Sequence, residues 1–98
     1  MRFEWDEEKN RRNLAKHKVS FETAKLVFED PDVLSIQDRV VEGEERWQTL
    51  GMVSGAILFV AHTYRDDGDG EAVRLISTRK AIPRERRVYA KSQKPSSG

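Results

Sequence analysis

The chain has 98 residues and a formal net charge of +1, which predicts one domain with a single hydrophobic core. The absence of cysteine excludes disulfides and thiolate metal sites, and two histidines are too few for a structural zinc site. No apolar run approaches the roughly 18 residues of a membrane helix, and the first residues do not form a signal peptide, so we expect a small, soluble, cytoplasmic protein without a metal or other cofactor.

The N-terminal third predicts a short strand followed by two helices. Residues 2–5 have extended character. Asp6 can cap a helix that runs to about Lys16, because its carboxylate accepts the free N–H groups of the first turn. Ser20 is the next N-cap, and Pro31 ends the second helix. The apolar residues of this second helix repeat with helical spacing: Phe21, Ala24, Val27 and Phe28.

The middle of the chain predicts a four-stranded antiparallel meander. Its strands are expected at residues 33–41, 45–53, 56–64 and 71–78, joined by turns at 42–44 and 54–55 and a loop at 66–70. A final basic helix starts near Ile82, with Pro83 in its first turn. The elements together predict an α+β domain over residues 1–91, with helices on one face of a curled sheet, and a disordered tail at 92–98.

The charges are distributed unevenly along the chain. Residues 19–73 hold four bases and twelve acids, whereas residues 74–91 hold seven bases and one acid. A basic segment on an otherwise acidic chain indicates a local anion site, and an Arg-rich helix with a solvated face is the alternative. If the anion is RNA, its path should follow residues 74–91 and the first helix, because the acidic middle would repel it.

A series of motifs follows one order from residue 3 to residue 89. The series consists of Phe3-x-Trp5-Asp6-x-x-Lys9, Asn13, Lys16-His17-x-Val19-Ser20-Phe21-Glu22, Ala24, Val27-Phe28, Asp30-Pro31, Arg46, Gly51, Leu58, His62-Thr63, Arg65, Ile76-Ser77-x-Arg79-x-Ala81, Glu85-Arg86 and Tyr89. In this order the chain resembles the BrnT toxins. It departs from them mildly at Lys18, where glycine is common.

The resemblance implies a RelE-like fold and a place in a type II toxin–antitoxin pair. BrnT proteins are metal-independent endoribonucleases that arrest translation. The implied partner is a BrnA-type antitoxin, a ribbon-helix-helix protein that binds operator DNA and represses the operon as a hetero-oligomer, expected to be a heterotetramer. The competing hypothesis is a non-catalytic subunit that docks a DNA-binding partner and modulates repression.

Metal-free RNA cleavage needs a group that moves protons and cations that stabilise the charge on phosphorus. The candidates for catalysis are His17, Arg65, Arg74 and Arg79, and the candidates for RNA binding are Lys9, His62, Lys80, Arg84 and Arg86. Glu85 and Tyr89 are further groups that could move a proton. Each candidate also has a structural interpretation as a packed histidine, an ion pair or a solvated base. Trp5 and Trp47 are better explained as core residues than as stacking platforms for bases.

A simple register for the last hairpin sharpens this hypothesis. If loop 66–70 joins the two strands, His62 lies opposite Arg74, and Ile57 lies opposite Arg79. His62, Tyr64 and Arg74 would then share the ligand face. The helices would cover the other face, which carries Ile57, Phe59, Ala61, Val73 and Leu75. Arg65 and Arg79 would lie roughly 25 Å apart, too far to hold one phosphate.

Overall fold

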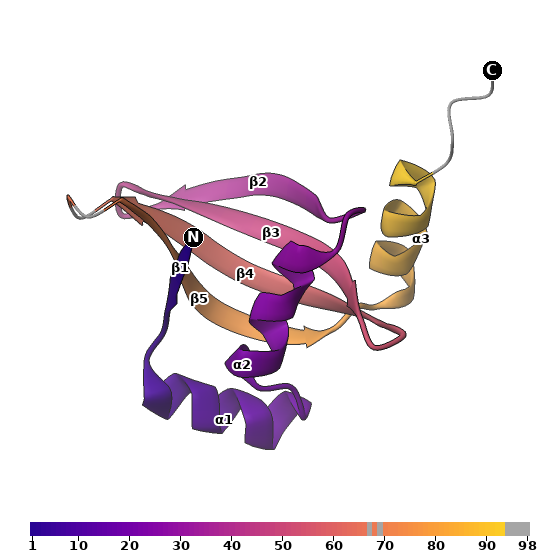
Figure 1. Ribbon diagram of the computed structural model, residues 1–98, viewed down its shortest axis with the longest axis horizontal. Coiled ribbons are helices and arrows are strands. Elements are labelled where there is room, and N and C mark those ends of the chain that lie inside the picture. Colours follow the sequence, from indigo (N-terminus) through magenta and orange to yellow (C-terminus); the bar gives the residue numbers. More distant parts are fainter. Residues whose placement is uncertain (67, 69, 94–98) are drawn as a thin grey trace.

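The computed structural model of the protein describes residues 1–66, 68 and 70–93 (Figure 1). These residues form one twisted sheet with helices packed against it. The elements in chain order are β1 (Arg2–Glu4), α1 (Glu7–His17), α2 (Phe21–Ala24), the 3-10 helix η1 (Lys25–Glu29), β2 (Leu34–Val41), β3 (Glu44–Val53), β4 (Ala56–Asp66), β5 (Glu71–Lys80) and α3 (Pro83–Ser92).

The sheet has five strands in the order β1-β5-β4-β3-β2. The four predicted strands form its antiparallel part, and two-residue turns with positive φ at both positions join β2 to β3 and β3 to β4. The three-residue strand β1 pairs in parallel with β5, with Arg2 beside Ala72. The sheet is therefore mixed, and the prediction of a purely antiparallel four-stranded sheet is wrong on this point.

The N-terminal helices begin at the predicted caps. The Asp6 carboxylate accepts the N–H groups of Glu8 and Lys9, and the Ser20 hydroxyl accepts that of Thr23. α1 ends one residue beyond the prediction, and Lys18 follows it in the left-handed region with φ 62°. The second predicted helix is a single turn, α2, that continues as the 3-10 helix η1.

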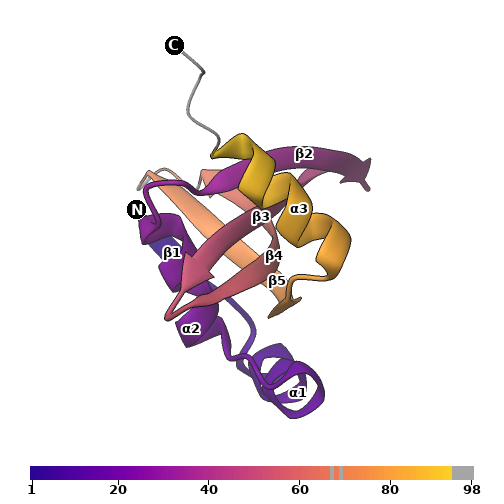
Figure 2. The ribbon, with the colours of Figure 1, turned by 90° about the vertical axis from the view of Figure 1, so that its right-hand side faces the viewer.

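Helices cover both faces of the sheet, not one. α2 and η1 pack on the face we call the core face, where their side chains meet Leu58, Val60, Val73 and Leu75. α3 covers one end of the opposite face, which we call the open face, through Tyr89 against Leu50 and Phe59. In Figure 2 the sheet runs between α3 and the two N-terminal helices.

The last hairpin has a different register from the predicted one. β4 extends to Asp66, which pairs with Glu71, so His62 lies opposite Leu75, and Thr63 lies opposite Arg74. A bulge between Ala61 and His62 then shifts the pairing by a further residue and brings Phe59 opposite Arg79. His62 packs against Phe28 on the core face, whereas Arg74 lies on the open face, so the predicted neighbourhood of the two side chains is wrong. The predicted grouping of Ile57, Phe59 and Ala61 with Val73 and Leu75 is also wrong, because the first three lie on the open face and the last two on the core face.

α3 begins at the predicted proline and ends at Ser92, one residue beyond the predicted end of the domain. The Glu85 carboxylate accepts the backbone N–H of Ile82, which fixes the first turn. Residues 94–98 of the predicted tail lie outside the described residues.

Gly51 is the point where η1 approaches the backbone of β3. A Cβ atom at this position would lie 2.7 Å from Val27 Cβ and 2.9 Å from Val27 O. Because the second of these atoms is backbone, we expect Gly51→Ala to lower the free energy of unfolding by about 2 kcal/mol. Urea denaturation measures this, with Gly43→Asn at the open β2–β3 turn as control; an unchanged midpoint for Gly51→Ala would contradict the close contact.

Candidate nucleic-acid interface

A groove of about 340 Å³ lies between α1 and the edge of β5. β1 covers this edge only as far as Arg74, so the remainder of β5 is free to meet α1. The α1 residues recur every three or four positions and therefore lie on one side of the helix. The residues that line the groove are Lys9, Arg12, Asn13, Lys16 and His17 from α1, and Ile76 and Ser77 from β5.

Asn13 fixes α1 against the sheet. Its side-chain amide donates to the carbonyl of Thr78 at 2.8 Å and accepts the Thr78 N–H at 3.1 Å, as a neighbouring strand would. The same amide donates to the carbonyl of Val19 at 2.9 Å. Asn10 accepts the N–H of Phe21 at 2.9 Å and so joins α1 to α2. These contacts hold the basic side of α1 beside β5.

The groove is a concentration of positive charge. None of the described residues that line it is acidic, and Lys9, Arg12 and Lys16 form no ion pair within the described part of the chain. His17 lies at the end of α1, half-buried, beside these cations. The arrangement supplies donors for a phosphate and one group that can carry a proton.

Arg65 and Arg74 form a second cluster on the open face. Their guanidinium groups lie 3.6 and 3.8 Å from the same oxygen of Glu4 on β1. One carboxylate thus faces two cations in this cluster. The parallel pairing of Glu4 with Arg74 produces this contact, and it depends on the strand that joins the sheet from the N-terminus.

Arg79 lies at the other end of β5 and is held by α3. Its guanidinium donates to both oxygens of Glu85, at 2.8 and 3.0 Å, and lies 4.2 Å from the centre of the Phe59 ring. Burial alone would raise the pKa of Glu85, but the hydrogen bonds from Arg79 and Ile82 outweigh it and hold this pKa below its usual range. Glu85 is therefore an ionised partner of Arg79, which makes it a poor proton donor.

The remaining basic candidates surround the start of α3. Arg84 lines a cavity of about 170 Å³ on the open face with Ile36, Gln48 and Val88 among its other walls. Arg86 donates to the carbonyl of Ala81 at 2.8 Å and lines a separate hollow with Lys80. The structure does not bring these bases into the α1–β5 groove.

His62 is a core residue, contrary to the prediction that it contacts RNA. Its side chain is 0% exposed, and its Nε2 lies 2.6 Å from the hydroxyl of Thr49. Phe28 and Tyr64 pack edge-on against the ring, at 5.1 and 5.2 Å between centroids. Burial lowers the pKa of His62 to about 4, so the ring is neutral near pH 7.

Tyr89 is also structural. Its hydroxyl donates to Asp30, whose carboxylate also accepts the N–H of Met52, so the contact joins α3 to β3. Burial and the neighbouring carboxylate raise the pKa of Tyr89 to about 12. A phenol held in this way is unsuited to moving protons at neutral pH.

The sequence identified Lys9 and His17 but missed their neighbours in the groove. Arg12 and Lys16 follow Lys9 by three and seven residues, a spacing that places all three on one side of a helix. This helical spacing could therefore have identified Arg12 and Lys16 from the sequence alone. The contributions of Ser77 and Asn13 depend on which edge of β5 is free, which the local pattern does not reveal.

No helix among the described residues has the length and apolar character needed to span a membrane. Within residues 1–66, 68 and 70–93, no three or more His, Asp or Glu side chains gather in a way that could hold a metal ion.

Comparison with known families matches residues 5–85 to the family described as the ribonuclease toxin BrnT of type II toxin–antitoxin systems. No curated protein matches the chain significantly. The matched residues begin just after β1 and include both N-terminal helices, all four strands of the meander and the start of α3. They also include every lining residue of the basic groove. Because the match covers most of its length, the chain belongs to the BrnT family of ribonuclease toxins of type II toxin–antitoxin systems.

Proposed function

We propose that this protein is a metal-independent endoribonuclease that binds RNA along the α1–β5 groove and moves a proton through His17. The observation that carries the proposal is the row of Lys9, Arg12 and Lys16 beside a histidine, with no acidic residue among the described lining. The candidate catalytic arginines, Arg65, Arg74 and Arg79, form ion pairs at two separate places. The cationic α1–β5 groove is therefore a better binding site for the reacting phosphate than these paired arginines.

The reaction is attack of a ribose 2′-oxygen on the adjacent phosphorus. The O2′–P bond forms and the P–O5′ bond breaks, which leaves a 2′,3′-cyclic phosphate and a 5′-hydroxyl. His17 accepts the 2′-hydroxyl proton, and the leaving 5′-oxygen takes a proton from a groove lysine or from solvent. Lys9, Arg12 and Lys16 stabilise the additional negative charge on the phosphorane.

The arginines of β5 extend this binding surface on both sides of the groove. Ser77 precedes Arg79 by two residues and follows Arg74 by three, or about 7 and 10 Å along a strand. We assign Arg74 and Arg79 to the flanking RNA backbone and Arg65 to the Glu4 cluster beside it. Lys80, Arg84 and Arg86 contribute to the positive potential near the start of α3.

RNA binding is expected to weaken about 50-fold when salt rises from about 50 to about 200 mM, as for four neutralised phosphates on a single strand. Filter binding at several salt concentrations measures the slope. Lys9→Ala with Arg12→Ala should make the slope shallower by about 1.4. Arg11→Ala should leave it unchanged, because Arg11 pairs with Glu8 outside the groove. A flat response in the wild-type chain would remove the electrostatic basis of the proposal.

We propose further that cleavage takes place in the cytoplasm and arrests translation. A BrnA-type antitoxin with a ribbon-helix-helix fold would neutralise the toxin and carry the complex, expected to be a heterotetramer, to operator DNA. Induction of the chain alone should stop growth, and co-expression of the antitoxin should restore it. Normal growth with intact RNA would favour a non-catalytic subunit that modulates repression.

A further inference from the structure

A second cavity, of about 540 Å³, lies where the β2–β3 hairpin meets β4. Its walls are Glu42, Gly43, Glu44, Glu45, Trp47 and Tyr64, and it shares none of them with the α1–β5 groove. Trp47 was expected in the core, but it is only half-buried and forms a wall of this cavity. The nuclease mechanism uses none of these residues.

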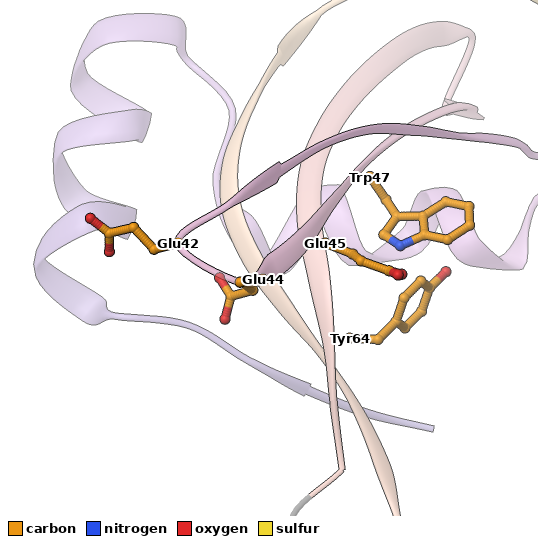
Figure 3. A pocket seen from close by; sticks show the side chains of 6 residues that line it. Glu42, Glu44, Glu45, Trp47 and Tyr64 are labelled. Atoms are coloured by element: carbon orange, nitrogen blue, oxygen red, sulfur yellow. The ribbon is translucent and has the colours of Figure 1, made fainter.

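The two aromatic rings form a corner, not a slot. Trp47 and Tyr64 lie 5.6 Å apart between centroids, with their planes at 75°. A flat nucleobase cannot lie between two rings that are nearly perpendicular, whereas a compact cation can contact both. Figure 3 shows the Glu45 side chain pointing toward the two rings, while Glu42 points away from them. The corner therefore combines aromatic surfaces with one carboxylate at close range.

The charge of the cavity also favours a cation. Glu44 lies 3.6 Å from Arg46, but Glu42 and Glu45 form no ion pair with any described residue. No base is among the described lining residues. The phosphates of RNA would meet unbalanced like charge here, so the charge opposes nucleic acid and complements a basic side chain.

The protein already holds one of its own guanidinium groups in this manner. Arg79 lies 4.2 Å from the centre of the Phe59 ring while it donates to both oxygens of Glu85. Aromatic contact and a forked pair of hydrogen bonds are the two interactions that distinguish arginine from lysine. The cavity provides the same two elements, a ring surface and a carboxylate, and none of its described lining residues is a cation.

We propose that this cavity binds an arginine side chain of the antitoxin. The guanidinium would stack against Trp47 or Tyr64 and donate to Glu45. The inference rests on the toxin–antitoxin part of the proposed function and not on the nuclease mechanism. It places a specific contact of the partner on a surface that the RNA does not use.

The first test uses N-acetyl-arginine amide as the probe and follows Trp47 by nuclear magnetic resonance. The arginine probe is expected to shift the indole signal of Trp47 and to bind more tightly than N-acetyl-lysine amide. Glu45→Gln should weaken this binding at least tenfold, whereas Glu29→Gln, a matched change outside the cavity, should not. Tighter binding of guanosine monophosphate than of the arginine probe would overturn the proposal in favour of a nucleobase site.

The second test uses the antitoxin itself. Glu45→Gln is expected to weaken antitoxin binding about tenfold and to leave RNA cleavage by the free toxin unchanged. In the wild-type chain, the arginine probe should compete with the antitoxin, which checks the contact without a substitution. The inference would be overturned if neither Glu45→Gln nor the arginine probe altered the affinity for the antitoxin. Failure of the nuclease proposal is distinguishable from this result, because the wild-type toxin would then leave RNA intact.

Discussion

Replacement of His17 by alanine is expected to slow RNA cleavage in EDTA by about 10²- to 10⁴-fold, the usual contribution of a positioned acid or base. His17 is the only histidine that lines the groove among the described residues, and His62 is fully buried elsewhere. RNA binding should change much less, because Lys9, Arg12 and Lys16 remain. Single-turnover cleavage of a labelled RNA, with binding measured in parallel, separates the two effects.

The control for this experiment lies on the same helix. Arg11→Ala removes a base that is paired with Glu8 outside the groove, so cleavage should remain near the wild-type rate. Circular dichroism on both variants checks that α1 is intact. An unchanged cleavage rate in His17→Ala, together with loss of activity in Arg65→Ala or Arg79→Lys, would indicate that the reaction takes place on the open face. Arg79→Lys is preferable to alanine, because the Glu85 side chain is only 15% exposed and would lose its partner.

Acidification is expected to destabilise the protein through His62 by about 3 kcal/mol between about pH 6.5 and pH 4. Burial lowers the pKa of His62 from 6.5 to about 4 in the folded chain. The unfolded chain therefore binds a proton first as the pH falls, which favours unfolding throughout this interval. The contribution to stability is complete above the unfolded pKa and is lost as the pH falls through the folded pKa. Urea denaturation at pH 7, 5.5 and 4.5 measures the loss.

His62→Leu is the matched variant, since leucine is apolar and does not titrate. The Thr49 hydroxyl keeps a partner in this variant, because it also lies 2.7 Å from the Ser35 hydroxyl. The carboxylates titrate equally in both proteins, so the difference between their pH profiles isolates the histidine. Identical profiles would show that His62 is protonated freely in the folded chain and is not desolvated.

Local features of the chain were largely predictable. The N-caps at Asp6 and Ser20, the proline at the start of α3 and both glycine-containing turns lie where the sequence places them. These features depend on interactions within a few residues, such as a side chain that accepts a nearby N–H or a backbone that needs positive φ. The basic side of α1 was also predictable, because helical spacing alone aligns Lys9 with Arg12 and Lys16.

The faces of the sheet were not predictable in the same way. One additional pair, Asp66 with Glu71, shifts the register so that His62 lies opposite Leu75 and on the other face of the sheet from Arg74. Because strand side chains alternate with a period of two, a shift of one residue transfers a side chain to the opposite face. The apolar segment 56–64 carries hydrophobic residues on both faces, so its pattern could not select the register.

The sequence by itself determined the class of elements, their caps and turns, the concentration of bases at residues 74–91 and the resemblance that the family match confirms. Only the tertiary structure decided which bases share a surface. The parallel pairing of β1 places Glu4 between Arg65 and Arg74, and the Asn13 amide holds α1 at the free edge of β5. Both contacts join residues more than sixty positions apart, and the register that creates them is chosen by packing of the whole sheet and not by any local preference.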